Sequence, residues 1–63
     1  MAQNRPPPGS MVYWRFNGVN HWSFGYCTYA GSYNMLRMGR WAGDTIGGII
    51  VDVADIEWKE YRR

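Results

Sequence analysis

The stretch that decides the fold lies near the middle of the chain and reads His21-Trp22-Ser23-Phe24-Gly25-Tyr26-Cys27-Thr28-Tyr29. It carries four Trp, Phe or Tyr rings and no Lys, Arg, Asp or Glu. Aromatic and small hydroxyl side chains favour a pleated, half-buried surface. Turn residues flank the stretch on both sides, at positions 17–18 and 30–32. We therefore predict that it forms the central strand of a very small sheet.

The glycine within this strand affects which side chains face the core. A glycine inside a strand often marks a bulge or sharp bend, and we predict one at Gly25. The inward-facing set can switch at such a position. Two alternatives therefore stay open, one with Phe24 and Tyr26 facing the core and one with Cys27 and Tyr29 doing so.

Strand signals also lie on both sides of the central strand. In residues 11–17 two sets of side chains alternate with the period of two that a strand imposes. This alternation places Val12 and Trp14 inward and Tyr13 and Arg15 outward. Asn-Gly at positions 17–18 then predicts a hairpin turn.

Two more strands are predicted after the central one. In residues 33–38, Leu36 and Met38 share one face. Residues 45–53 contain a β-branched run, Ile49-Ile50-Val51, which suits a buried strand. Between them, residues 39–44 form a loop bounded by glycines.

The C-terminal part has two interpretations. Residues 53–56 are typical of one short helical turn, with Asp55 as a candidate cap. Residues 57–61 alternate and predict a fifth, edge strand guarded by charges. A helix over residues 52–61 is the alternative, because Ala54 and Glu57 tolerate one.

The N-terminus differs in composition. Residues 1–10 contain three prolines and no periodic apolar face, which predicts a flexible tail that is dispensable for folding. A short polyproline II ligand for an aromatic groove is the other interpretation of this tail. The folded domain is then expected to span residues 11–63.

Length and composition narrow the class of protein. A chain of 63 residues forms one domain and buries only about 60% of its unfolded surface. With one cysteine it has no internal disulfide, and no Cys/His cluster predicts a metal or cofactor. Its four Trp, five Tyr and two Phe exceed what so small a core encloses, so some are expected on the surface or between copies. With neither a long apolar run nor a signal peptide, we expect a cytoplasmic protein without membrane contact.

Charge is distributed unevenly along the chain. Residues 1–43 carry four arginines and no acid, whereas residues 44–63 carry five acids against three bases. Without the terminal Arg5, Arg62 and Arg63, four bases face five acids. The strongly basic footprint typical of nucleic-acid binding is therefore missing from the body of the chain.

Five short strands, glycine turns and no long helix predict an all-β fold, a small, strongly bent, five-stranded antiparallel barrel with a short 3-10 turn before the last strand. The order of the hairpins, together with Trp22-x-x-Gly25-x-Cys27, resembles SH3-like barrels, including Tudor-type domains, over roughly residues 11–61. This resemblance implies the fold. The acidic loop and Trp-Trp pair of peptide-binding SH3 domains have no counterpart here, and a complete Tudor cage is not identified.

Catalysis has little support in the sequence. His21 and Cys27 lie six residues apart in one strand, hence about 20 Å apart, too far for a dyad. Asp52 and Asp55 are typical of solvated turn acids. Type II dihydrofolate reductases are SH3-like chains of similar size that form tetramers, but their Val-Gln-Ile-Tyr motif is not present. An oligomeric enzyme with a site between subunits is thus the remotest hypothesis, and no catalytic residue is predicted.

Binding is better supported, because Trp, Tyr and Arg dominate interaction hot spots. We predict a non-enzymatic module that binds a partner protein, or its own copies as a homo-oligomer; its size is typical of phage or mobile-element accessory proteins. Stacking on single-stranded DNA or RNA is the alternative. The predicted binding residues are Tyr13, Arg15, Trp22, Tyr26, Arg37 and Trp41.

Overall fold

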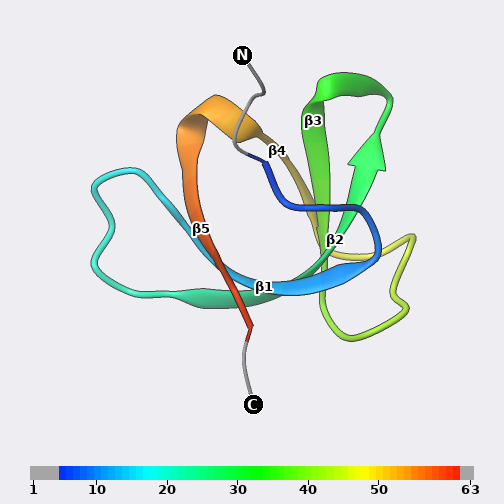
Figure 1. Cartoon of the computed structure of the whole chain (residues 1–63), viewed down its shortest axis with the longest axis horizontal. Helices are drawn as coiled ribbons and strands as arrows, with labels where there is room; N and C mark the ends of the chain where they lie inside the picture. Colours follow the sequence, from blue (N-terminus) through cyan, green and yellow to red (C-terminus); the bar gives the residue numbers. More distant parts are fainter. Residues whose placement is uncertain (1–4, 62–63) are drawn as a thin grey trace.

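The computed structural model describes residues 5–61, apart from the side chain of Tyr33. It contains a single antiparallel sheet of five strands in the order β4-β3-β2-β1-β5, with a 3-10 turn before the last strand (Figure 1). The prediction of an all-β fold with these five strands and this turn is confirmed. The elements are β1 (Ser10–Phe16), β2 (Ser23–Ala30), β3 (Ser32–Gly39), β4 (Ile49–Asp52), the 3-10 turn η1 (Val53–Asp55) and β5 (Ile56–Glu60).

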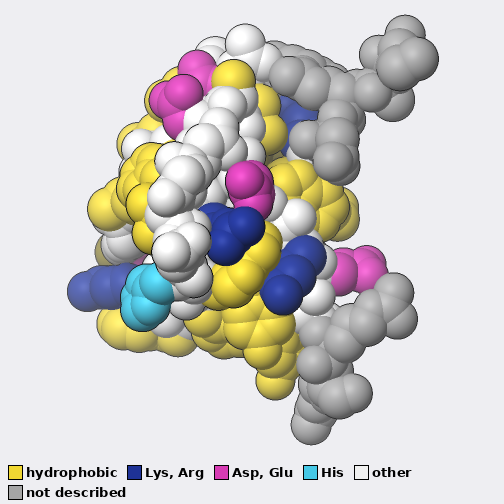
Figure 2. Space-filling model, turned by 90° about the vertical axis from the view of Figure 1, so that its left-hand side faces the viewer, with side chains coloured by type: hydrophobic (Ala, Val, Ile, Leu, Met, Phe, Trp, Pro, Cys, Tyr) yellow, Lys and Arg dark blue, Asp and Glu magenta, His cyan; other side chains and the backbone are white. Residues whose placement is uncertain are grey.

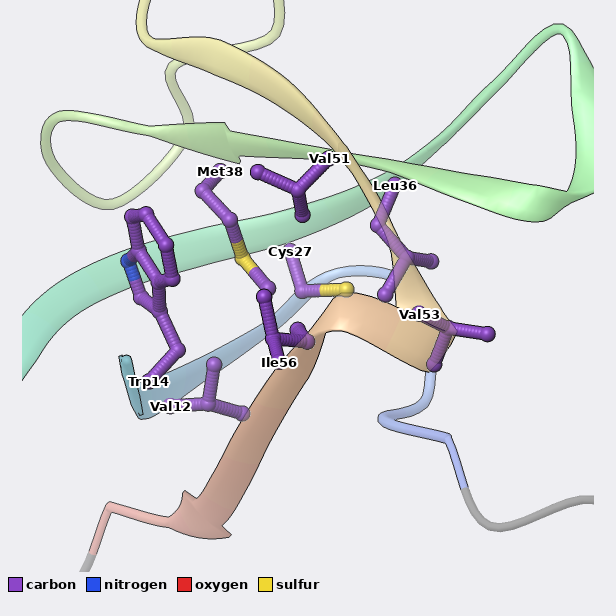
Figure 3. Close-up of a cluster of buried hydrophobic side chains, with 8 residues drawn as sticks. All are labelled: Val12, Trp14, Cys27, Leu36, Met38, Val51, Val53 and Ile56. Atoms are coloured by element: carbon purple, nitrogen blue, oxygen red, sulfur yellow. The ribbon is translucent and has the colours of Figure 1, made fainter. Parts of the chain in front are cut away.

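One face of this sheet forms the core. Its buried apolar side chains come from all five strands and from η1, and they point into one shared space (Figure 3). Trp14 lies at one end of the cluster, and Leu36 and Val53 lie at the other. Burying a side chain such as Leu36 stabilises the fold by roughly 1.5–3 kcal/mol. The cluster comprises Val12, Trp14, Cys27, Leu36, Met38, Val51, Val53 and Ile56.

The alternation predicted for β1 and β3 is confirmed. Val12 and Trp14 are buried, and so are Leu36 and Met38. Tyr13, between the two buried residues of β1, lies opposite Phe24 of β2 on the other face of the sheet. We call the face that carries Tyr13 the outer face.

Gly25 does not mark a bulge, so this part of the prediction is wrong. The β1–β2 register runs without a break through Gly25, and the irregularity lies later, between Tyr29 and Ala30. Of the two predicted pairs, Cys27 and Tyr29 lie on the core face, opposite Met38 and Leu36 of β3, whereas Phe24 and Tyr26 lie on the other face. Cys27 is buried, but Tyr29 is 47% exposed, and Phe24 is 43% exposed.

β4 is shorter and more exposed than predicted. The predicted strand over residues 45–53 is observed only as Ile49–Asp52, and the preceding loop extends over residues 40–48. Ile49 and Ile50 are about half exposed, although their β-branched run predicted burial. The reason is the position of β4 at the end of the sheet, where β3 is its only strand neighbour among the described residues. Of the three residues in the run, only Val51 enters the core.

The last strand follows the strand interpretation and not the helical one. β5 pairs with β1 in a continuous antiparallel register. The cap of η1 is Asp52 and not Asp55 as predicted, since the Asp52 carboxylate accepts a hydrogen bond from the Ala54 amide at 2.9 Å. Asp52 precedes the turn, where a carboxylate reaches the free amides of its first residues.

The predicted tail is partly integrated into the fold. Pro6 is fully buried, and the Gly9 amide donates a hydrogen bond to the Cys27 carbonyl at 2.7 Å. β1 itself begins at Ser10, inside the predicted tail. The described part of the segment therefore packs on the sheet, and residues 1–4 lie outside the described residues.

Candidate binding surface

Six aromatic and basic side chains gather on the outer face over β1, β2 and β5. We call this surface the aromatic face. Figure 2 shows basic side chains lying directly against hydrophobic surface on this side of the molecule, with acidic side chains next to them. Its members are Tyr13, Arg15, Trp22, Phe24, Lys59 and Tyr61.

Three rings of the aromatic face form a closed triangle. The centroids of Tyr13 and Phe24 are 5.7 Å apart, those of Tyr13 and Tyr61 are 5.6 Å apart, and those of Phe24 and Tyr61 are 4.9 Å apart. These tilted and edge-to-face geometries are the ones that aromatic quadrupoles favour. The rings hold one another in place while Phe24 and Tyr61 remain 43% and 39% exposed.

Trp22 extends this surface across β1 and β5. The Arg15 guanidinium lies 4.3 Å from the centroid of the Trp22 ring, and the Lys59 ammonium lies 4.5 Å from it. Arg15 comes from β1 and Lys59 from β5, so the indole lies over both strands. Such cation–π contacts at partly exposed sites contribute about 0.5–1 kcal/mol each.

Arg15 is also paired with an acid. Its Nε and Nη2 atoms both donate to Oε1 of Glu57, at 3.0 and 2.7 Å. The two residues are direct cross-strand partners of β1 and β5. Because both side chains are partly exposed, solvent limits the pair to about 0.2–1 kcal/mol. Its main effect is to fix the guanidinium and to offset its charge.

The structure brings together half of the predicted binding residues. Tyr13, Arg15 and Trp22 belong to the aromatic face. Tyr26 of β2 also lies on the outer face, with Met11 of β1 and Gly39 of β3 as its cross-strand partners. The other two predicted residues lie elsewhere.

Arg37 and Trp41 are positioned by the β3–β4 region. Arg37 lies opposite Thr28 and Ile50, and its guanidinium donates to the Ile46 carbonyl at 3.4 Å. Trp41 is 57% exposed on the loop 40–48 and stacks with Arg40, whose guanidinium lies 4.4 Å from the ring centroid. No ring contact joins Trp41 to the aromatic face within residues 5–61.

Sequence reasoning missed three members of the aromatic face, namely Phe24, Lys59 and Tyr61. Their signal was alternation, since Lys59 and Tyr61 share one parity in the last strand. Phe24 lies directly opposite Tyr13 through the β1–β2 pairing, whereas the proximity of Lys59 and Tyr61 to Tyr13 depends on the pairing of β1 with β5, residues 40 or more positions apart. Local pattern does not predict that pairing.

The loop 40–48 is organised by one buried acid. Asp44 is only 6% exposed, and its carboxylate accepts hydrogen bonds from the amides of Arg40 and Gly47, both at 2.8 Å. The amide of Ile46 and the Nε of Arg40 also donate to it, each at 3.3 Å. These hydrogen bonds lower the pKa of Asp44 from 3.8 to about 2. The role of this carboxylate is to shape the loop.

A shallow depression of about 370 Å³ lies at the β2–β3 end of the sheet. It is lined by Arg5, Tyr29, Gly31 and Ser32. The Arg5 guanidinium lies 4.2 Å from the centroid of the Tyr29 ring. The described part of the lining contains no acid, and no nucleophile beyond hydroxyl groups.

The thiol of Cys27 lies in the core. Cys27 is fully buried, and burial raises the pKa of its thiol from 9.0 to about 11 against a smaller opposing effect of Arg5. Within residues 5–61, no cluster of three or more His, Cys, Asp or Glu side chains could hold a metal ion. In the same part of the chain, no helix has the length and apolar character needed to cross a membrane.

Comparison of the chain with family models, with curated proteins and with solved structures found no match. Function is therefore inferred from the geometry of the aromatic face.

Proposed function

We propose that this chain is a non-enzymatic binding module that engages a partner protein through the aromatic face. The observation that carries the proposal is the stack of Trp22 on Arg15 and Lys59 beside the triangle of Tyr13, Phe24 and Tyr61. The meander of β1 to β4 with β5 beside β1 supports an SH3-like barrel as the scaffold of this module.

Preorganisation supports the binding role. Ordering flexible side chains on association costs about 0.5–1.5 kcal/mol each. The rings of the aromatic face already contact one another, and Arg15 is held by Glu57 and by Trp22. Because these side chains are already ordered in the free chain, binding a partner adds little of this cost. Rigid aromatic and arginine side chains of this kind dominate hot spots between proteins.

The charges of the surface favour protein over nucleic acid. Phosphate binding needs cations that can exchange counterions for phosphate oxygens. Here Glu57 offsets Arg15, and Lys59 lies over Trp22. Arg37 lies beside β4, where it donates to the Ile46 carbonyl.

A peptide-display selection tests this proposal and does not require an identified partner. The intact chain is immobilised and a random peptide library is selected on it, with counter-selection on the Trp22→Ala variant. We expect enriched peptides that bind the wild-type chain and the Trp41→Ala control but not Trp22→Ala. Trp41 is the matched control because it is a partly exposed, cation-stacked tryptophan outside the aromatic face.

Two results would contradict the proposal. One is a selection that yields only peptides insensitive to Trp22→Ala. The other is tight, strongly salt-dependent binding of single-stranded oligonucleotides in a parallel filter-binding assay, which would favour the nucleic-acid alternative.

A further inference from the structure

A second exposed apolar surface lies on β4 and on the loop before it. Ile46 is 87% exposed, the most of any large hydrophobic side chain in the described residues. Ile49 and Ile50 are 46% and 49% exposed. β3 and β2 separate β4 from β1, so this surface is distinct from the aromatic face. We call these three isoleucines and the free side of β4 the isoleucine edge.

Within residues 5–61 no strand pairs with the free side of β4, so the isoleucine edge offers backbone groups as well as apolar side chains. β4 pairs with β3 over residues 49–52 and ends the sheet on its other side. Every second residue of such a strand directs its N–H and C=O away from the sheet, which makes the edge a template for another strand. Ile50 lies on the outer face opposite Arg37, and Ile49 on the core face opposite Met38. Exposed apolar surface therefore flanks the free edge on both faces.

The two ends of the sheet differ in how they are protected. β5 carries Glu57, Lys59 and Glu60, and charges on an edge strand oppose pairing with another chain. Residues 45–51 carry no charge. The carboxylate of Asp52, at the end of β4, is engaged by the Ala54 amide. The isoleucine edge thus lacks the protection that β5 has.

We infer that two copies of this chain associate by antiparallel pairing of β4 with β4 of the second copy, so that the two isoleucine edges cover each other. Charge selects the antiparallel direction. In a parallel pair the two Asp52 carboxylates would lie on neighbouring strands about 5 Å apart. In an antiparallel pair with the two copies of Ile50 opposite each other, the carboxylates lie four residues apart along the ladder, about 13 Å, where salt screens them.

The same arrangement places the two copies of Arg37, the cation opposite Ile50 on β3, at a tolerable distance. Arg37 is one strand in from the edge, so the two copies of Arg37 lie three strand spacings apart, about 14 Å. In a pair related by a two-fold axis, each isoleucine edge is covered by the other, so neither edge is left to bind a third copy. The inferred assembly is therefore a dimer and not a filament, with one sheet continuing through both chains.

Sedimentation velocity of the intact chain over a concentration series of about 1 to 200 µM tests the inference, since a short ladder gives a modest affinity. For the wild type we expect the mass to rise from one chain of 7.3 kDa to two chains and no further. Ile50→Lys places like charges across the two-fold axis and should raise the dissociation constant at least about tenfold. Val19→Lys is the matched control, because Val19 is 43% exposed in the β1–β2 turn, away from β4.

A second measurement is made on the wild-type chain alone, for the case in which the Ile50→Lys variant does not fold. Hydrogen exchange of the wild-type amides of residues 49–52 should slow as concentration rises, while the amides of β5 should not respond. A single-chain mass at every concentration would overturn the inference, as would growth beyond two chains. It would also be overturned by a folded Ile50→Lys variant that dimerises like the wild type.

Discussion

Gly25 of β2 lies directly against the indole of Trp14 on β1. A Cβ atom at position 25 would lie 2.9 Å from Nε1 and 3.0 Å from Cδ1 of Trp14, and 3.3 Å from Cβ of Met38. Position 25 therefore has to be glycine because the largest core side chain occupies the space that a methyl group would need. The role of this glycine is close packing, with no break in the β1–β2 register.

Gly25→Ala should destabilise the chain by roughly 1–3 kcal/mol, the usual cost of overpacking a core. Urea unfolding followed by tryptophan fluorescence measures it. The double variant Gly25→Ala with Trp14→Phe provides the control, since a smaller ring frees the space. We expect the cost of the double variant to be less than the sum of the two single costs. Strict additivity would show that the contact does not carry the effect.

Pro6 and Pro7 should respond differently to the same substitution. Both prolines restrict the unfolded chain, but Pro6 is fully buried and Pro7 is exposed. Pro6→Ala should lower the thermal midpoint by several degrees, because about 1 kcal/mol corresponds to 4–8 °C in a chain of this size. Pro7→Ala should change it by less than about 2 °C. Equal midpoints for the two variants would show that the segment before β1 does not contribute to the fold.

Asp44 should make the stability depend on pH in the acid range. Its pKa is about 2 in the folded chain against 3.8 ordinarily, so its contribution is present above pH 3.8 and is lost as pH falls towards 2. Asp44→Asn should therefore lower the thermal midpoint more at a pH of about 6 than at a pH of about 2. Asp55→Asn is the control, because Asp55 is exposed in η1. A gap between wild type and Asp44→Asn that stays constant with pH would contradict the role given to this carboxylate.

Cys27 should be inert in the folded chain. With a pKa of about 11, roughly one thiol in a thousand is ionised at pH 8, and the side chain is fully buried. Labelling by a disulfide reagent at pH 8 should be slow until denaturant is added, and then fast. Rapid labelling of the native chain would indicate that β2 opens readily, and would contradict the burial of this residue.

The sequence predicts much of the sheet because its signals are local. Alternation in β1 indicates that Val12 and Trp14 face the core, and the hairpin at Asn17-Gly18 follows from turn chemistry. The strand before the C-terminus is found through the alternation of residues 57–61. In each case the information lies within a few neighbouring residues.

The errors arise where position in the sheet outweighs local pattern. Ile49 and Ile50 have the composition of a buried strand, but β4 is at the end of the sheet, so they are half exposed. Pro6 is in a proline-rich segment that has no periodic face, yet tertiary packing buries it. Trp41 and Trp22 are equally plausible as binding residues in the sequence. Only the β1–β5 register places Trp22 over Arg15 and Lys59.

The most direct test of the aromatic face as the binding surface is a calorimetric titration of a peptide selected on the wild-type chain, at two salt concentrations. We predict that Trp22→Ala weakens binding by about 2 kcal/mol, which is roughly thirtyfold, while Trp41→Ala leaves the affinity near that of the wild type. Doubling the salt should have a much smaller effect than Trp22→Ala. Equal affinity of the wild type and a folded Trp22→Ala variant would contradict the claim that the aromatic face is the binding surface.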